Sequence, residues 1–166
     1  MKKRYVMPLV GAMAAASIVT GLAAAQASTT AVSATTSEEM PFAVESFAYP
    51  GADQILAERK ITLKQGDGNI TLLSNCSGYD IKVESRLDDR GYCFDVKGAQ
   101  GYLTLEVPDA YGIWTQAYAV QAQLTPEGET SSVTVTAPKN DYTAVGQGDA
   151  NTGRKRSVLV ELRVKG

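Results

Sequence analysis

The clearest alternation of hydrophobic and polar residues lies in the centre of the chain, between residues 76 and 107. Three runs within it, at residues 79–86, 92–97 and 103–107, place apolar side chains at every second position. A period of two is typical of half-buried β-strands. Turn-forming residues separate the runs, and Pro108, which has no backbone N–H to donate, is expected to end the third strand. The centre of the chain is therefore predicted to be antiparallel β-structure.

The alternation continues toward the C-terminus. Two runs, residues 118–124 and 133–137, flank a turn at Pro126 and predict a β-hairpin. A closing strand follows near the end of the chain. In that strand, the residues predicted to share one face are Val158, Val160, Leu162 and Val164.

The pattern is shorter on the N-terminal side of the centre. Residues 61–63 and 70–72 each predict a short strand, and residues 65–69 between them are rich in turn formers, so we expect a hairpin. Just before these strands, Asp53 is a candidate N-cap for a short helical turn through Ile55 and Leu56.

With a further short run at residues 142–145, these segments amount to about eight or nine strands at a spacing of about 10 residues. We predict an all-β fold, an antiparallel two-sheet sandwich of Greek-key or jelly-roll type. A partly open barrel is the alternative. Residues 146–156 hold three glycines and the basic triplet Arg154-Lys155-Arg156, and they are predicted to form an exposed loop.

The start of the chain resembles a secretory signal peptide. Basic residues at positions 2–4 precede an apolar run over residues 6–25 and the small-residue site Ala25-Gln26-Ala27. We therefore expect cleavage after Ala27 and assign residues 1–27 to a signal peptide. A membrane anchor is the alternative, because about 20 apolar residues are long enough to span a bilayer.

After the signal, residues 28–46 are rich in Ser, Thr and Ala without a period, and they predict a flexible segment before a domain at residues 47–166. Removing 27 of the 166 residues leaves 139, which is enough for one domain with a core. The remaining 13 basic and 18 acidic residues carry a net charge of about −5, which argues against a nucleic-acid partner. No second apolar run is long enough to span a bilayer, so we expect no membrane association after cleavage.

Two cysteines in an exported chain predict one disulfide, Cys76 to Cys93. A tight hairpin at residues 88–91 would put Cys93 opposite Arg86, which is 10 positions from Cys76 or about 33 Å along an extended strand. A disulfide allows less than about 7 Å between Cα atoms. The chain must therefore double back at Ser77-Gly78, or residues 88–91 must cross between sheets, and we favour the crossover.

Most catalytic chemistry is excluded by composition. The chain has no histidine, which removes Ser-His-Asp and Cys-His devices, and it has no P-loop or dinucleotide-binding glycine motif. The carboxylate pairs Glu106/Asp109 and Asp88/Asp89 remain as candidates for a hydrolase. Turns and solvated strand faces account for them more simply, and we predict that the chain is not an enzyme.

Two glycine-rich segments carry paired oxygen ligands. Asp67 and Asn69, and again Asp149 and Asn151, stand two residues apart, as in parts of calcium-binding loops. A complete site requires several more ligands, and both segments also read as turns. We therefore expect neither a metal nor a cofactor.

The candidate binding residues are Tyr111 and Trp114. Both stand in residues 109–114, which we predict to be a loop between strands, and Trp114 is the chain's single tryptophan. Loops at the end of a sandwich often carry binding residues, and a Trp-Tyr pair can stack on a sugar ring or anchor a protein partner. In the alternative, Trp114 and Ile113 lie under the sandwich as a core plug.

Several stretches are similar to a group of small exported actinomycete proteins of unassigned function. The stretches are LKQGDGNITLLSNC, RGYCFDVKG, GYLTLEVPDAYGI and SVLVELRV, which together span most of residues 61–164. The resemblance implies export and a compact β domain. It implies no activity, ligand or catalytic residue.

Our leading functional hypothesis is a secreted, non-catalytic binding protein that acts at the cell envelope or outside the cell. Its partner is expected to be an extracellular glycan or protein. The second hypothesis is an exported inhibitor or accessory partner of an extracellular enzyme. The third is a hydrolase that uses carboxylates in place of histidine.

Overall fold

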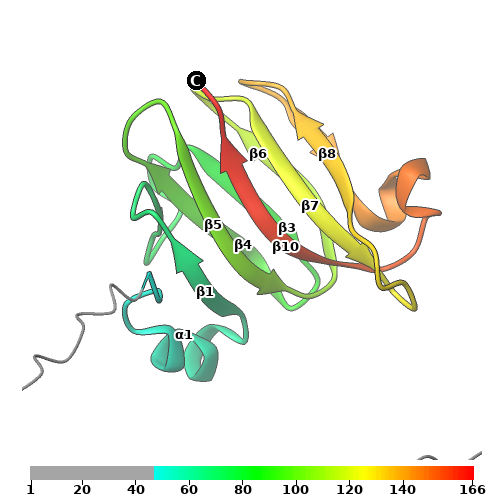
Figure 1. The fold of residues 1–166 in the computed structure, drawn as a ribbon, viewed down its shortest axis with the longest axis horizontal. Helices are drawn as coiled ribbons and strands as arrows, with labels where there is room; N and C mark the ends of the chain where they lie inside the picture. Colours follow the sequence, from blue (N-terminus) through cyan, green and yellow to red (C-terminus); the bar gives the residue numbers. More distant parts are fainter. Residues whose placement is uncertain (1–46) are drawn as a thin grey trace, which may run out of the picture. The chain divides into compact units, whose positions relative to one another are not determined.

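The computed structural model describes residues 47–166, which form two five-stranded antiparallel sheets packed face to face (Figure 1). The predicted all-β sandwich is confirmed, with ten strands rather than eight or nine. Sheet A is built, in spatial order, from β1 (Thr62–Gly66), β5 (Gly101–Val107), β10 (Ser157–Val164), β7 (Val120–Pro126) and β8 (Val133–Ala137). Sheet B is built from β2 (Ile70–Leu72), β4 (Asp88–Val96), β3 (Ile81–Ser85), β6 (Ala110–Thr115) and β9 (Tyr142–Ala144). The predicted signal peptide (1–27) and flexible segment (28–46) lie outside the described residues.

Most connections lead from one sheet to the other. Only β2 to β3, β3 to β4 and β7 to β8 stay within a sheet. The β7–β8 hairpin confirms the prediction for residues 118–137, with Val120 opposite Ala137 and Leu124 opposite Val133. The predicted β1–β2 hairpin is wrong, because β1 lies in sheet A and β2 in sheet B. Turn residues mark where a chain reverses, but they do not say whether it returns to the same sheet.

The two sheets share one hydrophobic core. Apolar side chains at alternate strand positions meet between the sheets, as the period of two predicts for most strands. Each fully buried large apolar side chain contributes roughly 1.5–3 kcal/mol. The largest are Tyr92, Phe94, Ile61, Leu63, Ile70, Ile81, Leu103, Leu105, Ile113, Leu124, Leu159 and Leu162.

The closing strand departs from its predicted phase. The pairing of β10 with both β5 and β7 shifts register between Leu159 and Glu161, which is the mark of a β-bulge. In the pairing with β7, Val160 is the extra residue of β10, whereas in the pairing with β5 the extra residue lies on β5, between Thr104 and Val107. The phase of the alternation in β10 changes at Val160, so Leu159 is buried while Val160 is partly exposed. The predicted shared face is therefore wrong for Val158 and Val160, which are both partly exposed, and right for Leu162 and Val164, which are both buried.

Helix α1 (Ala52–Arg59) precedes β1. Its N-cap is Gly51, which makes no side-chain cap, so the predicted cap at Asp53 is wrong. Asp53 instead lies in the first turn and Arg59 in the last turn, where their charges complement the helix dipole. Ile55 packs on the core, while Leu56 is exposed.

The predicted disulfide between Cys76 and Cys93 is present, with Cα atoms 5.2 Å apart. It does not mark a crossover between sheets. Residues 86–87 form a tight turn between β3 and β4 of the same sheet, so the favoured crossover is wrong and the chain doubles back instead. Gly78, with φ of 70°, lies in this reversal.

The reversal carries the chain across β4. Leu73 N donates to Cys93 O (2.8 Å) on the β2 side, and Asp80 N donates to Phe94 O (3.0 Å) on the β3 side. The Cys93 side chain alternates with the core residues Tyr92 and Phe94, yet it is fully buried. The segment that crosses β4 therefore covers the outer face at Cys93, and the disulfide fastens it there.

The predicted loop at residues 146–156 contains two short 3₁₀ helices, η1 (Gly146–Gly148) and η2 (Ala150–Thr152). Thr152 is buried, whereas the triplet Arg154-Lys155-Arg156 is exposed as predicted. In residues 47–166, no helix has both the length and the apolar character required of a membrane span.

Candidate functional site

Tyr111 and Trp114 lie on a strand rather than in a loop. Pro108 and Asp109 turn the chain tightly from β5 to β6, with Asp109 at φ 51°, and β6 then includes both aromatic residues. The predicted loop at residues 109–114 is therefore wrong. A strand holds these side chains more rigidly than a loop would.

Trp114 projects from the outer face of sheet B. It is 39% exposed, whereas its neighbour Ile113 is fully buried in the core. The core-plug alternative therefore holds for Ile113 and fails for Trp114. This placement makes Trp114 available to a ligand.

Tyr142 on β9 lies directly opposite Trp114. The two rings are 4.7 Å apart at their centroids and tilted by 46°, which is a favourable arrangement for an aromatic pair. Tyr142 is 38% exposed, so both rings remain open to solvent. Lys82 stands opposite Trp114 on its other side, on β3.

A glycine makes room for this pair. Gly112 faces Ala144 of β9 and Glu84 of β3, and it has no side chain to fill the space between them. A Cβ atom there would lie 2.6 Å from the Tyr142 hydroxyl and 2.9 Å from a Glu84 carboxylate oxygen. The Tyr142 ring therefore lies over the backbone of Gly112, where a larger residue would displace it.

Tyr111 joins the same surface through a β-bulge. Ser85 pairs with Ala110 and Glu84 pairs with Gly112, so Tyr111 is the extra residue of β6. Its ring lies 5.7 Å below the Arg86 guanidinium. We refer to Tyr111, Trp114 and Tyr142 as the aromatic cluster.

Charged groups surround the aromatic cluster. Lys82 Nζ lies 3.6 Å from Glu84 Oε1, and Arg86 donates to the Gln147 side chain. Burial raises the pKa of Tyr142, and the nearby Glu84 and Tyr111 add to this shift. Tyr142 is therefore a neutral hydroxyl at physiological pH, able both to donate and to accept a hydrogen bond.

An open depression adjoins the cluster. It has a volume of about 260 Å³ and is lined by Ser85, Arg86, Asp89 and Tyr111. Because Ser85 is buried, the accessible polar groups are the Arg86 guanidinium and the Asp89 carboxylate. The outer face of sheet B thus combines aromatic side chains with positively and negatively charged hydrogen-bonding groups.

Tyr142 was missed by the sequence reasoning. Residues 142–145 were recognised as a strand, but no pattern connected them with Trp114, which is 28 positions earlier. The available signal was an aromatic residue on a short strand after a proline turn. That signal identifies an aromatic residue on a strand but not the strand that pairs with it.

Three of the four carboxylates considered for hydrolysis, Glu106, Asp109 and Asp88, have basic partners. Lys64 Nζ binds Glu106 Oε1 at 2.5 Å, while Arg156 Nε lies 3.5 Å from Asp109 Oδ1. Asp88 and Asp89 are successive residues of β4 where its pairing with β3 shifts register. Asp88 binds Arg90 and Arg59, whereas Asp89 lines the depression beside Tyr111. Within each pair, the two carboxylates therefore have different surroundings.

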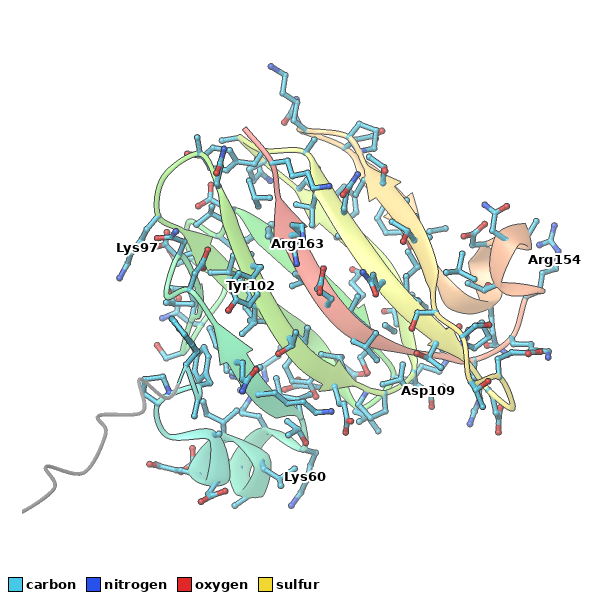
Figure 2. The ribbon with its side chains drawn as sticks, in the orientation of Figure 1. Lys60, Lys97, Tyr102, Asp109, Arg154 and Arg163 are labelled. Carbon is cyan, nitrogen blue, oxygen red and sulfur yellow. A yellow bond between two sulfur atoms is a disulfide. The ribbon has the colours of Figure 1, made fainter. Side chains whose placement is uncertain are left out.

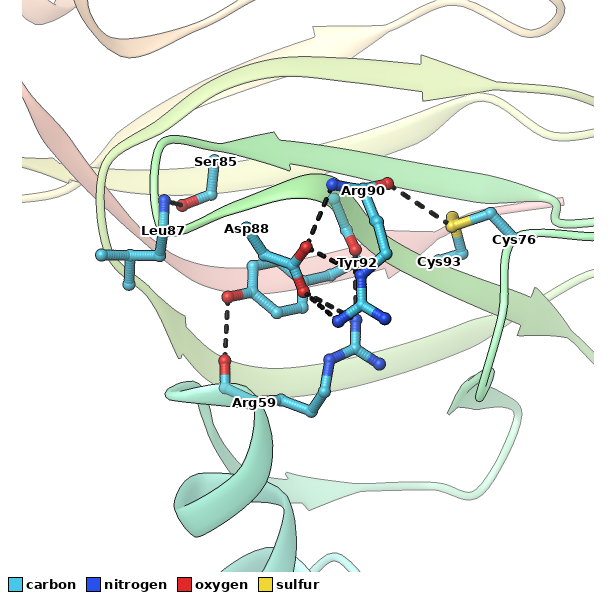
Figure 3. A network of polar contacts seen from close by, with 9 residues as sticks. Arg59, Cys76, Ser85, Leu87, Asp88, Arg90, Tyr92 and Cys93 are labelled. Carbon is cyan, nitrogen blue, oxygen red and sulfur yellow. Dashed lines mark hydrogen bonds and ion pairs between the residues drawn. A yellow bond between two sulfur atoms is a disulfide. The ribbon is translucent and has the colours of Figure 1, made fainter.

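Asp88 belongs instead to a network that attaches α1 to sheet B (Figure 3). Arg90 donates to both carboxylate oxygens at 3.0 and 3.1 Å, and Arg59 Nη2 lies 3.5 Å from Oδ2. The hydrogen bond from the Arg90 side chain is the main cause of the lowered pKa of Asp88. Tyr92 Oη also donates to the carbonyl oxygen of Arg59 (2.9 Å), where α1 ends.

The two segments considered for calcium close as tight turns. The Asp67 carboxylate accepts from Asn69 N at 3.0 Å, and the Asp149 carboxylate accepts from Asn151 N at 2.9 Å. Over residues 47–166, no group of three or more His, Cys, Asp or Glu side chains is placed to hold a metal ion. Local turn chemistry accounts for both segments.

Comparison of the chain with protein-family models and with curated proteins gave no match.

Proposed function

We propose that this chain is an exported, non-catalytic binding protein whose ligand is a glycan held on the aromatic cluster. The main support for this proposal is the contact between Trp114 and Tyr142, two exposed rings on a rigid sheet face. Covering a large aromatic side chain is favourable in free energy. Two such side chains left exposed together on a strand surface are therefore typical of a binding site.

The surroundings of the cluster favour a sugar. The C–H face of a pyranose ring packs on an aromatic ring, while its hydroxyl groups need donors and acceptors close by. Lys82, Glu84 and Arg86 supply such groups beside the rings. A few polar groups next to an aromatic surface are what orient a small polar ligand.

Export and the absence of catalysis belong to the same proposal. The signal-like residues 1–27 and the disulfide between Cys76 and Cys93 support an oxidising, extracellular location. The absence of histidine from the sequence and the pairing of Glu106 and Asp109 with basic groups support binding without catalysis.

The test is binding of the exported protein to insoluble polysaccharides, such as cellulose, chitin, xylan and purified cell wall. We expect at least one of them to retain the wild type, and Trp114→Ala to reduce that retention at least tenfold. Tyr102→Ala is the matched control, because Tyr102 stands on the outer face of sheet A. Equal retention of wild type and Trp114→Ala, or no retention of the wild type by any polysaccharide, would overturn the glycan proposal.

Gly112→Ala tests whether binding depends on how the rings of the aromatic cluster are arranged, because it changes their arrangement and leaves the three residues in place. The added methyl group must displace the far end of the Tyr142 side chain while all three aromatic residues remain. We expect weaker retention, and a change in Trp114 emission that reports the lost ring contact. Unchanged emission and retention would show that the ring over Gly112 does not shape the site.

A protein partner is the second candidate, and Arg86 favours it. Its guanidinium lies over Tyr111, on the strand that also carries Trp114, and Arg, Tyr and Trp are the residue types that dominate binding energy at protein interfaces. In this reading the chain inhibits or assists an extracellular enzyme. Inhibition of one enzyme in a panel of secreted proteases and glycosidases, lost in Arg86→Ala, would favour it over the glycan.

A further inference from the structure

Each sheet ends in two edge strands, and the β1 edge is covered. Gly66 N donates to Phe47 O at 3.1 Å, and Tyr49 N donates to Lys64 O at 2.8 Å, so residues 47–49 run along β1. The register of β1 with β5 also shifts between Leu63 and Gln65. Covering and a bulge are both devices that prevent a sheet edge from pairing with another chain.

The two edges of sheet B are short. β2 and β9 have three residues each, and Tyr49 Oη accepts the backbone N–H of Leu72 in β2. After β9, Val145 N donates to Tyr111 O and the chain continues into η1. Short edges offer few free backbone groups to a partner strand.

Within residues 47–166, the β8 edge of sheet A has none of these protections. Its five residues, Val133–Ala137, pair with β7 without a register shift, and at the other edge their backbone makes no hydrogen bond to any of the described residues. No charged residue occurs between positions 130 and 138. β8 is therefore a regular, neutral strand with a free row of N–H and C=O groups.

The charged residues that flank β8 are complementary to those of a second, antiparallel copy of β8. Glu129 precedes β8 and Lys139 follows it, so an antiparallel copy brings opposite charges together at both ends. A pairing centred on Thr134 also places Val133 opposite Val135 of the other copy on the core side. Glu129 is exposed and already 2.6 Å from Lys155, so it would exchange or share this partner.

We propose that two copies of this chain associate by antiparallel pairing of their β8 edges around Thr134, which joins the two A sheets into one. The pairing covers little surface, so we expect a transient dimer with a Kd on the order of 10–100 µM. The two-fold axis of such a pair stands perpendicular to the sheet. Both B sheets therefore face the same side, and if the proposed function holds, the dimer presents two aromatic clusters to one polysaccharide surface.

Analytical ultracentrifugation of the exported protein from about 1 µM to 1 mM, without glycan, tests the pairing. We expect the wild type to shift from monomer to dimer, and Thr134→Lys to weaken dimerisation at least tenfold, because two lysines would stand side by side. Thr62→Lys is the matched control on the covered β1 edge and should dimerise as the wild type does. Circular dichroism and melting curves verify that each variant folds.

A charge swap tests the register directly. Thr134→Glu alone should weaken dimerisation as Thr134→Lys does, whereas an equimolar mixture of the two variants should form the heterodimer, since residue 134 faces its own counterpart. Hydrogen exchange of the wild type should show concentration-dependent protection in β8. A monomeric wild type at 1 mM, a dimer unaffected by both substitutions, or protection at the Trp114 surface instead would overturn the proposal. A dimer without glycan retention would overturn only the proposed function.

Discussion

The two outer faces of the sandwich differ in how they are built. On sheet A, polar side chains contact one another in regular rows: Arg163 Nε binds Glu161 Oε1 at 2.9 Å, and the Arg163 guanidinium lies 5.4 Å from the ring of Tyr102. Figure 2 shows Tyr102 and Arg163 on neighbouring strands of this sheet. On sheet B, the outer face combines exposed aromatic rings, a strand bulge, and a segment that crosses β4 and is attached to it by the disulfide.

The difference shows where the sandwich leaves aromatic side chains exposed. Sheet A mostly follows the simple alternation of its sequence, and several of its outward polar groups bind one another, such as Gln123 with Glu161 and Lys64 with Glu106. Sheet B departs from the alternation at Tyr111 and at the Cys76 crossing, and it exposes Trp114 and Tyr142 beside the first of these positions. Irregular positions of this kind re-aim side chains, which regular strands cannot do.

The largest expected effect tests an irregularity at the centre of sheet A, the bulge in β10. Leu159→Ala removes a fully buried side chain and should lower the free energy of unfolding by about 3–5 kcal/mol. Val160→Ala, at the partly exposed extra residue, should cost less than about 1 kcal/mol. Urea denaturation of both variants measures the difference. A larger loss for Val160 than for Leu159 would mean that β10 keeps the simple alternation and has no bulge here.

The next effect concerns the crossing segment on sheet B. The disulfide closes a loop of sequence separation 17, so Cys93→Ser should cost about 3 kcal/mol and lower the melting temperature by several degrees. Cys76→Ser and the double variant should show similar losses, because all three remove the same bond. A melting temperature unchanged by reduction of the native protein would contradict this account.

A smaller effect is expected at the aromatic cluster itself. Trp114→Ala should cost less than about 1.5 kcal/mol, since the side chain lies on the surface and is partly exposed. Its emission in the wild type should be quenched by iodide and should shift when the right ligand binds. An emission maximum typical of a hydrocarbon environment, together with a loss above about 3 kcal/mol on substitution, would contradict its surface position.

The smallest effect concerns the charge network at the end of sheet B near α1. The pKa of Asp88 is lowered in the folded state, so its ionised form stabilises the fold above its unfolded pKa of about 3.9. This contribution should disappear as the pH falls from there through the folded pKa. Asp88→Asn should therefore reduce stability at pH 7 and lessen its dependence on pH below 4. The exposed neighbour Asp89, changed to Asn, is the control, and an equal response of the two variants would rule out a specific role for Asp88.

Much of the fold follows from local rules. The period of two located most strands, and Pro126 marked the turn of a hairpin that the structure confirms. The same rules were wrong about residues 109–114, where turn formers at Pro108 and Asp109 suggested a loop but the chain turns tightly and continues as β6. A two-residue turn and a six-residue loop begin with the same turn-forming residues, so the local sequence does not distinguish them.

The candidate site was only partly visible in the sequence. Trp114 and Tyr111 drew notice as rare aromatic residues, yet their exposure depends on strand phase and on the bulge at Tyr111. Tyr142 and Gly112 complete the site through pairing between β6 and β9. Such pairing depends on contacts between residues far apart in the chain, which no local pattern records.

By itself, the sequence determined the all-β class and the disulfide between Cys76 and Cys93, because alternation and cysteine number act through local geometry and simple counting. The tertiary structure alone decided the sheet to which each strand belongs, the crossing of β4, and the contact of Trp114 with Tyr142. The physical reason is that a strand satisfies its backbone hydrogen bonds with any suitable neighbour. The choice among neighbours is made by the packing of the whole core.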